Sequence, residues 1–257
     1  MSSWQKKLGF IGNKERGFSL IELSIVLVII GVLSMASLQV FNAVNNYRNQ
    51  TLANKALLQA QQALVFFAQG NFRLPCPDIN GDGYEDCAGG YKTGQLPFYT
   101  VGLPVSSQVA DVDVGFQNLI YGVFRDAAND AELTVLAERT GDSLGDADYQ
   151  NMDDFKKALS NASLLAVTNN QPFITGDNHS SGSEDCSTNQ VANGAFWLAS
   201  SSFEDADGNG NFFDGVNASL KHDGSGSLCF AAPSRRQDAN YVDRVSGLAF
   251  SELIGLL

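Results

Sequence analysis

The feature that most constrains this chain is a long uncharged apolar stretch close to its N-terminus. Residues 23–47 contain no charged side chain, and about 20 apolar residues suffice for a helix that crosses a bilayer. A basic segment with Lys6, Lys7, Lys14 and Arg16 precedes the stretch, an asymmetry that keeps an N-terminus cytoplasmic. We therefore expect an N-terminal helix whose first half spans a membrane.

The junction between the basic segment and the apolar stretch carries a specific motif. Residues 16–31 read R-G-F-S-L-I-E-L-S-I-V-L-V-I-I-G, and this string resembles the type III signal of type IV pilins and pseudopilins. The resemblance implies that a prepilin peptidase cuts between Gly17 and Phe18, that the new N-terminus is methylated, and that Glu22 directs assembly with other pilin or pseudopilin subunits. An ordinary secretory signal fits less well, because the residues after Val32 offer a cleavage site only loosely.

Glu22 also has a physical role of its own. A carboxylate inside a membrane costs roughly 2.5 kcal/mol or more at mid-depth, so it needs a partner. After cleavage, the Phe18 amine of a staggered neighbouring copy could supply that partner as an ion pair. The alternative is a plain anchor helix whose carboxylate reaches the cytoplasmic headgroups.

The helical pattern continues beyond the apolar stretch. No proline or glycine occurs between Asn46 and Gly70, and the pattern predicts one helix from about residue 19 to about residue 69, on the order of 75 Å long at 1.5 Å per residue. Apolar residues recur there at three-to-four spacing, which indicates one apolar stripe. The stripe is Leu52, Ala56, Gln59, Ala63, Phe66 and Phe67.

The rest of the chain has the size of a single domain. Apolar patterning predicts a helix over 149–167 and several strands, at 119–124, 133–137, 191–201, 228–232 and 241–250. This mix favours an α+β head in which helices cover one face of an antiparallel sheet, packed on the long helix. The expected organisation is a leader at 1–17, a transmembrane and assembly helix at 18–70, and a periplasmic or extracellular head at 71–257.

All four cysteines follow the long helix, where the chain would meet an oxidising compartment. Four cysteines allow three pairings. We favour Cys76–Cys87, which closes a short loop, together with Cys186–Cys229, which joins distant segments. Zinc is the alternative, but the chain has no C-x-x-C pair and only two histidines, so a zinc site is disfavoured.

Two loops follow the D-x-[DN]-x-[DN]-G pattern, in which alternate side-chain oxygens and a turn glycine wrap a calcium ion. Neither loop has the glutamate that completes an EF-hand, since Gly89 and Val216 stand at the twelfth position. The alternative for each loop is a turn without an ion. Calcium is thus a candidate cofactor, and no organic cofactor is expected. The candidate ligands are Asp78, Asn80, Asp82 and Asp86 in the first loop, and Asp205, Asp207 and Asn209, with Asp214 as a further candidate, in the second.

One string matches a catalytic motif. Residues 141–145 fit G-x-S-x-G around Ser143, between a predicted strand and a predicted helix, as in hydrolases. A polar loop is the competing interpretation, and neither His179 nor His222 stands in a recognisable partner motif. We therefore expect the protein not to be an enzyme.

The charge of the chain bears on its partners. The formal net charge is −12, and removal of the leader, with its four basic and one acidic residue, leaves −15. Binding to nucleic acid needs clusters of basic residues against phosphate, and the pair Arg235-Arg236 is too small to supply one. Nucleic acid is therefore not an expected partner.

Together these features predict a structural filament subunit. We expect a minor pilin or pseudopilin of a type IV pilus or a type II secretion pseudopilus, with the head's size pointing by analogy to a minor subunit. Before assembly it would lie in the inner membrane with its N-terminus cytoplasmic, and afterwards in a periplasmic pseudopilus or a cell-surface pilus. The alternative is an adhesin-like binding module displayed on the filament for cell adhesion.

Overall fold

The structure is a computed structural model that describes residues 19–109, 112–139, 150–176, 186, 189–201, 205–238 and 240–257. It divides into two compact units, Met1–Asn45 and Asn46–Leu257. The fold combines a long N-terminal helix with a globular part that contains an antiparallel sheet. The predicted α+β class is confirmed.

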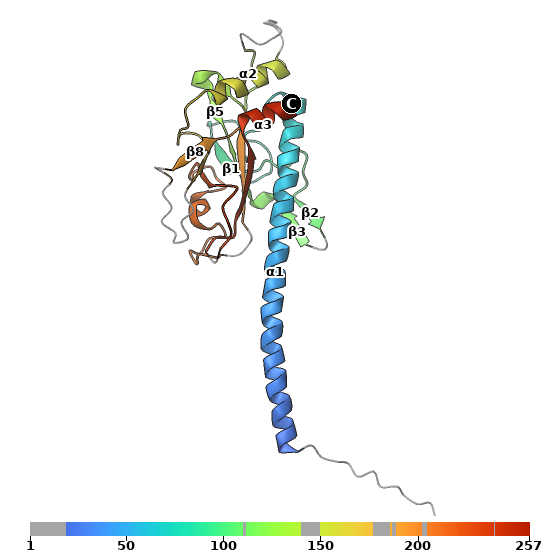
Figure 1. The fold of residues 1–257 in the computed structure, drawn as a ribbon. Helices are drawn as coiled ribbons and strands as arrows, with labels where there is room; N and C mark the ends of the chain where they lie inside the picture. Colours follow the sequence, from blue (N-terminus) through green and yellow to red (C-terminus); the bar gives the residue numbers. More distant parts are fainter. Residues whose placement is uncertain are drawn as a thin grey trace, which may run out of the picture. The chain divides into compact units, whose positions relative to one another are not determined.

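Helix α1 runs from Leu20 to Asn71 (Figure 1), close to the predicted bounds. It contains no proline, so its backbone hydrogen bonds continue without a break. The helix ends where Phe72 adopts a left-handed backbone conformation, with φ of 53°, and donates its N–H to the carbonyl of Ala68 at 3.0 Å. Pro75 follows three residues later and prevents the helix from resuming.

The expectation that the first half of α1 spans a membrane is not confirmed. Among the residues that the structure describes, no helix is long and apolar enough to cross a membrane.

The central sheet has four antiparallel strands in the order β1-β4-β9-β11. Their bounds are Thr93–Gln95, Leu119–Val123, Phe196–Ser200 and Arg244–Leu248. Every residue of β4 and β9 is buried. Because successive side chains of a strand point to opposite faces, burial of all of them requires a cover on both sides of the sheet.

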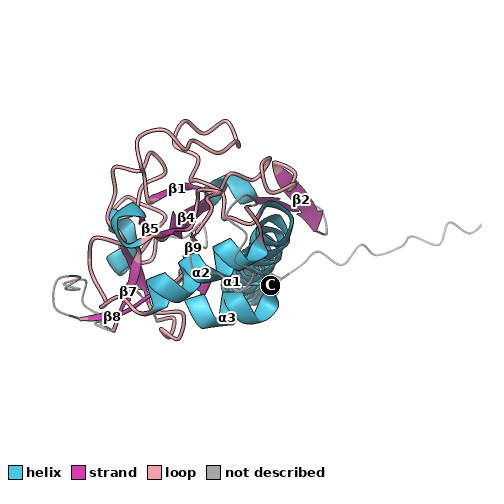
Figure 2. Cartoon of the chain, turned by 90° about the horizontal axis from the view of Figure 1, so that it is seen from above, coloured by secondary structure: helices cyan, strands magenta, loops and turns pink. Residues whose placement is uncertain are grey.

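Helices cover the first face. The second half of α1, helix α2 (Met152–Ser163) and helix α3 (Phe250–Leu256) share one apolar core with alternate residues of β4 and β9. In Figure 2 these three helices lie on the same side of the sheet, as the sequence predicted. Gln69 near the end of α1 donates a hydrogen bond from Nε2 to the carbonyl of Leu256 in α3 at 2.8 Å.

The second face carries a separate core. Ile120, Trp197 and Ala199 project into it and pack with Phe230 and Tyr241. The cover includes a small sheet of β10 (Cys229–Ala231), β7 (Phe173–Thr175) and β8 (Gln190–Asn193), in which β10 and β7 are parallel and β7 and β8 antiparallel.

The remaining elements are two hairpins and three short helices. The hairpins are β2 Ser106–Val109 with β3 Val112–Gly115 and β5 Arg125–Asp126 with β6 Ala131–Glu132. The short helices are η1 Phe116–Asn118, η2 Ala127–Asn129 and η3 Gly215–Ser219.

Some predicted elements differ from the observed ones. The strand predicted at 133–137 is wrong, because the chain forms a turn there directly after β6. The strand predicted at 191–201 is divided into β8 and β9, and the end of the one predicted at 241–250 belongs to α3. The apolar stripe of α1 is also misjudged at its end: Phe66 is 69% exposed, and the fully buried positions there are Leu64 and Ala68.

Candidate functional site

The first unit presents an apolar helix surface. From Leu20 to Val44 of α1, the large apolar side chains whose positions are described are 45% to 87% exposed. An apolar surface of this extent usually marks a contact with other protein or with lipid. This part of the helix is therefore suited to pack against other protein or lipid.

Glu22 is the acidic residue in the first turn of α1 and is exposed to solvent. Its position is favourable for a negative charge, because the free N–H groups of a helix's first turn carry partial positive charge. Ser24 in the next turn donates its Oγ hydrogen to the carbonyl of Ile21 at 2.8 Å. Gly17 and Phe18 lie outside the described residues, so the position of the cleavage site stays a prediction.

The four cysteines form two disulfides, Cys76–Cys87 and Cys186–Cys229, with Cα atoms 5.1 and 6.0 Å apart. This is the pairing favoured from the sequence. Glu85 lies beside the first disulfide, but the two sulfur atoms are bonded to each other and not free to bind zinc.

The first acidic loop is closed by backbone hydrogen bonds. Asp78 is fully buried and accepts N–H groups from Gly81 at Oδ1 and from Gly83 at Oδ2, each at 2.7 Å. Asp86 accepts the N–H of Ile79 at 2.9 Å. These oxygens therefore have donors within the loop itself.

The other two candidates in the first loop form local turns. Asn80 Oδ1 accepts the N–H of Asp82 at 2.9 Å, and Asp82 Oδ1 accepts that of Tyr84 at 2.8 Å. Within the described part of the chain, no group of three carboxylates gathers its oxygens here.

The second acidic loop brings three carboxylates together. Asp205, Asp207 and Asp214 each offer an oxygen, and these oxygens lie within 4.8 Å of one another. Asp214 is fully buried, whereas Asp205 is partly buried. Asn209, the other predicted ligand, donates its amide to Asp207 at 2.9 Å. The sequence pattern thus identified two members of the cluster and named Asp214 as a further candidate.

Asp243, which precedes β11, is a buried carboxylate next to Asp214 that sequence reasoning missed. It is 1% exposed and accepts the N–H of Asp214 at 2.9 Å and the amide of Asn217 at 3.1 Å, both at Oδ2. Its Oδ1 is buried without a hydrogen-bond partner among the described residues. The only signal in the sequence was a carboxylate next to apolar residues at the start of a predicted strand.

Burial and mutual repulsion raise the pKa of two of these acids. Burial raises the pKa of Asp214, although N–H groups from Val242 and Ala206 offset part of the effect. For Asp243, burial raises the pKa well above its usual range, and the charges of Asp214 and Asp207 add to the rise. The cluster therefore disfavours negative charge unless a proton or a cation balances it.

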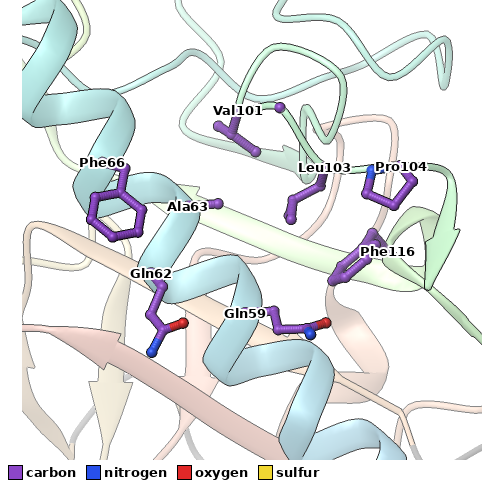
Figure 3. Close-up of a pocket in the computed structure, with 9 residues that line it drawn as sticks. Gln59, Gln62, Ala63, Phe66, Val101, Leu103, Pro104 and Phe116 are labelled. Carbon is purple, nitrogen blue, oxygen red and sulfur yellow. The ribbon is translucent and has the colours of Figure 1, made fainter. Parts of the chain in front are cut away.

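The head also has an open groove beside α1 (Figure 3). It has a volume of about 350 Å³, and its described lining contains no charged side chain. Figure 3 shows side chains of α1 on one side and those of the 101–104 loop with Phe116 on the other. The lining residues are Gln59, Gln62, Ala63, Phe66, Val101, Gly102, Leu103, Pro104 and Phe116.

The structure adds little on the hydrolase motif. Ser143, the whole G-x-S-x-G string and His179 lie outside the described residues. His222 lies in the loop after η3 and is exposed.

Comparison with known proteins gives one match, at the N-terminus. Residues 12–38 match the family described as the prokaryotic N-terminal methylation motif. The match supports a prepilin-type signal and, with it, a type IV pilin-like or pseudopilin-type secreted subunit. Such a signal implies processing by prepilin peptidase and assembly with other pilin subunits. No curated protein and no solved structure matches the chain.

Proposed function

We propose that the protein is a non-catalytic structural subunit of a type IV pilus or a type II secretion pseudopilus. In this proposal prepilin peptidase removes residues 1–17 and the mature chain joins the filament through the first half of α1. The observation that carries the proposal is the methylation motif at 12–38, which continues into a helix with an exposed apolar surface.

The position of Glu22 supports this route of assembly. It is a carboxylate surrounded by exposed apolar residues such as Ile21 and Leu23. Where such a surface packs against neighbours or lipid, the carboxylate loses water and needs a cation close by. Cleavage before Phe18 creates an amine on every copy, four residues before the carboxylate of the same chain. A neighbour displaced along the filament can bring its amine to Glu22.

The proposal also includes a location. Before assembly, the precursor would be held at the inner membrane with residues 1–17 in the cytoplasm, and after assembly the head would be displayed in the periplasm or at the cell surface. The two disulfides fit a head that folds in an oxidising compartment. A minor rather than a major subunit is favoured by the size of the unit Asn46–Leu257.

Assembly can be tested with three variants expressed in the native host. We expect Glu22→Ala and Glu22→Gln to be produced and cleaved like the wild type but to be reduced at least tenfold in sheared filaments, because both remove the charge. Ser24→Ala is the matched control, since it changes an exposed polar residue two positions away on the same helix and should assemble normally. Wild-type incorporation of Glu22→Gln would show that the charge is not needed and would contradict the ion pair.

A further inference from the structure

The groove beside the second half of α1 is an uncharged surface on an acidic chain. Its described lining contains no charged side chain, whereas the chain as a whole has a formal net charge of −12. Two acidic chains repel each other where their charged surfaces approach. Contact between subunits is therefore favoured where charge is absent, and the cores of protein interfaces are depleted in charged residues.

The loop that faces α1 across the groove is held in shape by backbone hydrogen bonds. Gly102 donates its N–H to the carbonyl of Tyr99 at 3.1 Å. Leu103 donates its N–H to the carbonyl of Phe98 at 2.7 Å, and Phe116 beside the loop is fully buried. A partner therefore meets a preformed surface, which lowers the entropic cost of binding.

Phe66 supplies an exposed aromatic ring on the α1 side of the groove (Figure 3). Its side chain is 69% exposed, although its neighbours Leu64 and Ala68 are fully buried in the head. Aromatic side chains are enriched in protein interfaces. The ring is therefore available to a partner rather than used in the core.

The chain also carries a surface that is complementary to the groove. The first half of α1 exposes large apolar side chains such as those of Leu33 and Phe41, which are 60% and 63% exposed, and residues 23–47 contain no charge. An apolar helix face that lies in an apolar groove is a recurring mode of recognition. Because the helix half and the groove are different surfaces, a contact between them on two chains is head-to-tail, and such contacts build open filaments when they do not close into a ring.

We propose that the groove receives the uncharged apolar N-terminal helix of a neighbouring filament subunit, a segment with the chemistry of residues 23–47. Its large side chains would pack between Phe66 and the 101–104 loop. This inference rests on the proposed function and extends it by naming a surface that covers the assembly helix. Lipid fits the groove less well, because the groove lies on the head, which stands outside the membrane in the proposed function.

A photo-crosslink in sheared filaments tests the contact. Benzoylphenylalanine is placed in the full chain at position 66, and crosslinked pairs of chains are digested and identified by mass spectrometry. We expect most crosslinks between chains to join position 66 to the N-terminal helix of the neighbour, residues 18–47 in a second copy. The same probe at Leu164, which is 82% exposed at the end of α2, is the matched control and should not reach that helix. Crosslinks from position 66 that reach only the heads of neighbours, or only lipid, would overturn the proposal.

A charge placed in the groove gives a quantitative test. Phe66→Glu should reduce the protein recovered in sheared filaments at least tenfold, whereas Leu164→Glu should assemble like the wild type. Both positions are exposed, so the unfolding midpoint of the purified protein should change little in either variant. Normal incorporation of Phe66→Glu would contradict the contact. Absence of the wild type from filaments would overturn the proposed function and this inference with it, whereas normal filaments with crosslinks elsewhere would overturn the inference alone.

Discussion

The two halves of α1 differ in what surrounds their apolar side chains. In the half before residue 46, residues such as Leu27 are exposed, 62% in this case, whereas in the half that follows Leu64 is fully buried in the core of the head. One helix thus contains a segment whose apolar side chains are exposed and a segment whose apolar side chains belong to the core of the head. The comparison indicates that the buried apolar residues of the second half stabilise the head, whereas those of the first half are, under the proposed function, available for contacts between chains.

The largest effect on folding is expected from Leu64→Ala. This change removes a fully buried side chain from the core that α1 shares with the sheet, and it should cost about 3 kcal/mol of unfolding free energy. Denaturant unfolding can be followed by the fluorescence of Trp197, which is buried on the other face of the sheet.

The matched control is the same substitution in the first half of the helix. Leu27→Ala should change the unfolding free energy of the head by about 0.5 kcal/mol or less, yet reduce the protein recovered in filaments. If Leu27→Ala destabilised the head as much as Leu64→Ala, the distinction between the two halves would fail.

A smaller effect is expected from added volume. Ala60 is fully buried against the head, so Ala60→Leu should overpack the core and cost about 2 kcal/mol. Asn54→Leu introduces the same side chain at an exposed position of the same helix half and should be close to neutral. Equal unfolding midpoints for the two variants would show that the helix does not pack tightly at Ala60.

The smallest effect concerns the ion pair between Arg73 and Glu85, just after the end of α1. Arg73 donates two hydrogen bonds to Glu85, at 2.6 and 2.7 Å. Burial raises the pKa of Glu85, but the bonds from Arg73 and from the N–H of Cys76 outweigh it, so that the pKa is lowered overall from its ordinary value of 4.5. Glu85→Gln should therefore cost about 1 kcal/mol at pH 7, since both side chains remain partly exposed.

The pH dependence of this effect has a definite sign. A carboxylate with a lowered pKa in the folded state stabilises the protein above its unfolded pKa, and the contribution is lost as the pH falls through the folded value. The difference in unfolding free energy between the wild type and Glu85→Gln should shrink from pH 6 to pH 3. A difference that stayed constant over this range would show that the ion pair is not its source.

The sequence was sufficient to predict the elements with strong local patterns. These include α1, with its uninterrupted helical pattern, the apolar strands β4 and β10, and helix α2, whose N-terminal Asn151 and Asp154 form a capping box. The α+β class followed from the same patterns. Disulfide pairing was favoured correctly because one pair closes a short loop.

Elements that depend on distant partners could not be predicted in this way. Strand β1 is only Thr-Gly-Gln, without an apolar pattern, and becomes a strand because it pairs with β4. The same limit applies to the acidic cluster. The loop motif indicated Asp205 and Asp207, but Asp243 lies 29 residues beyond Asp214 and reaches it only through the fold.

The measurement that tests the central claim most directly is the N-terminal residue of the protein recovered from sheared filaments. If prepilin peptidase removes residues 1–17 and the first half of α1 then joins the filament, Edman sequencing and mass spectrometry should show a chain that begins at Phe18, with a methylated amine. A chain that begins at Met1, or after Ala36 as ordinary signal-peptide removal would give, would contradict the account.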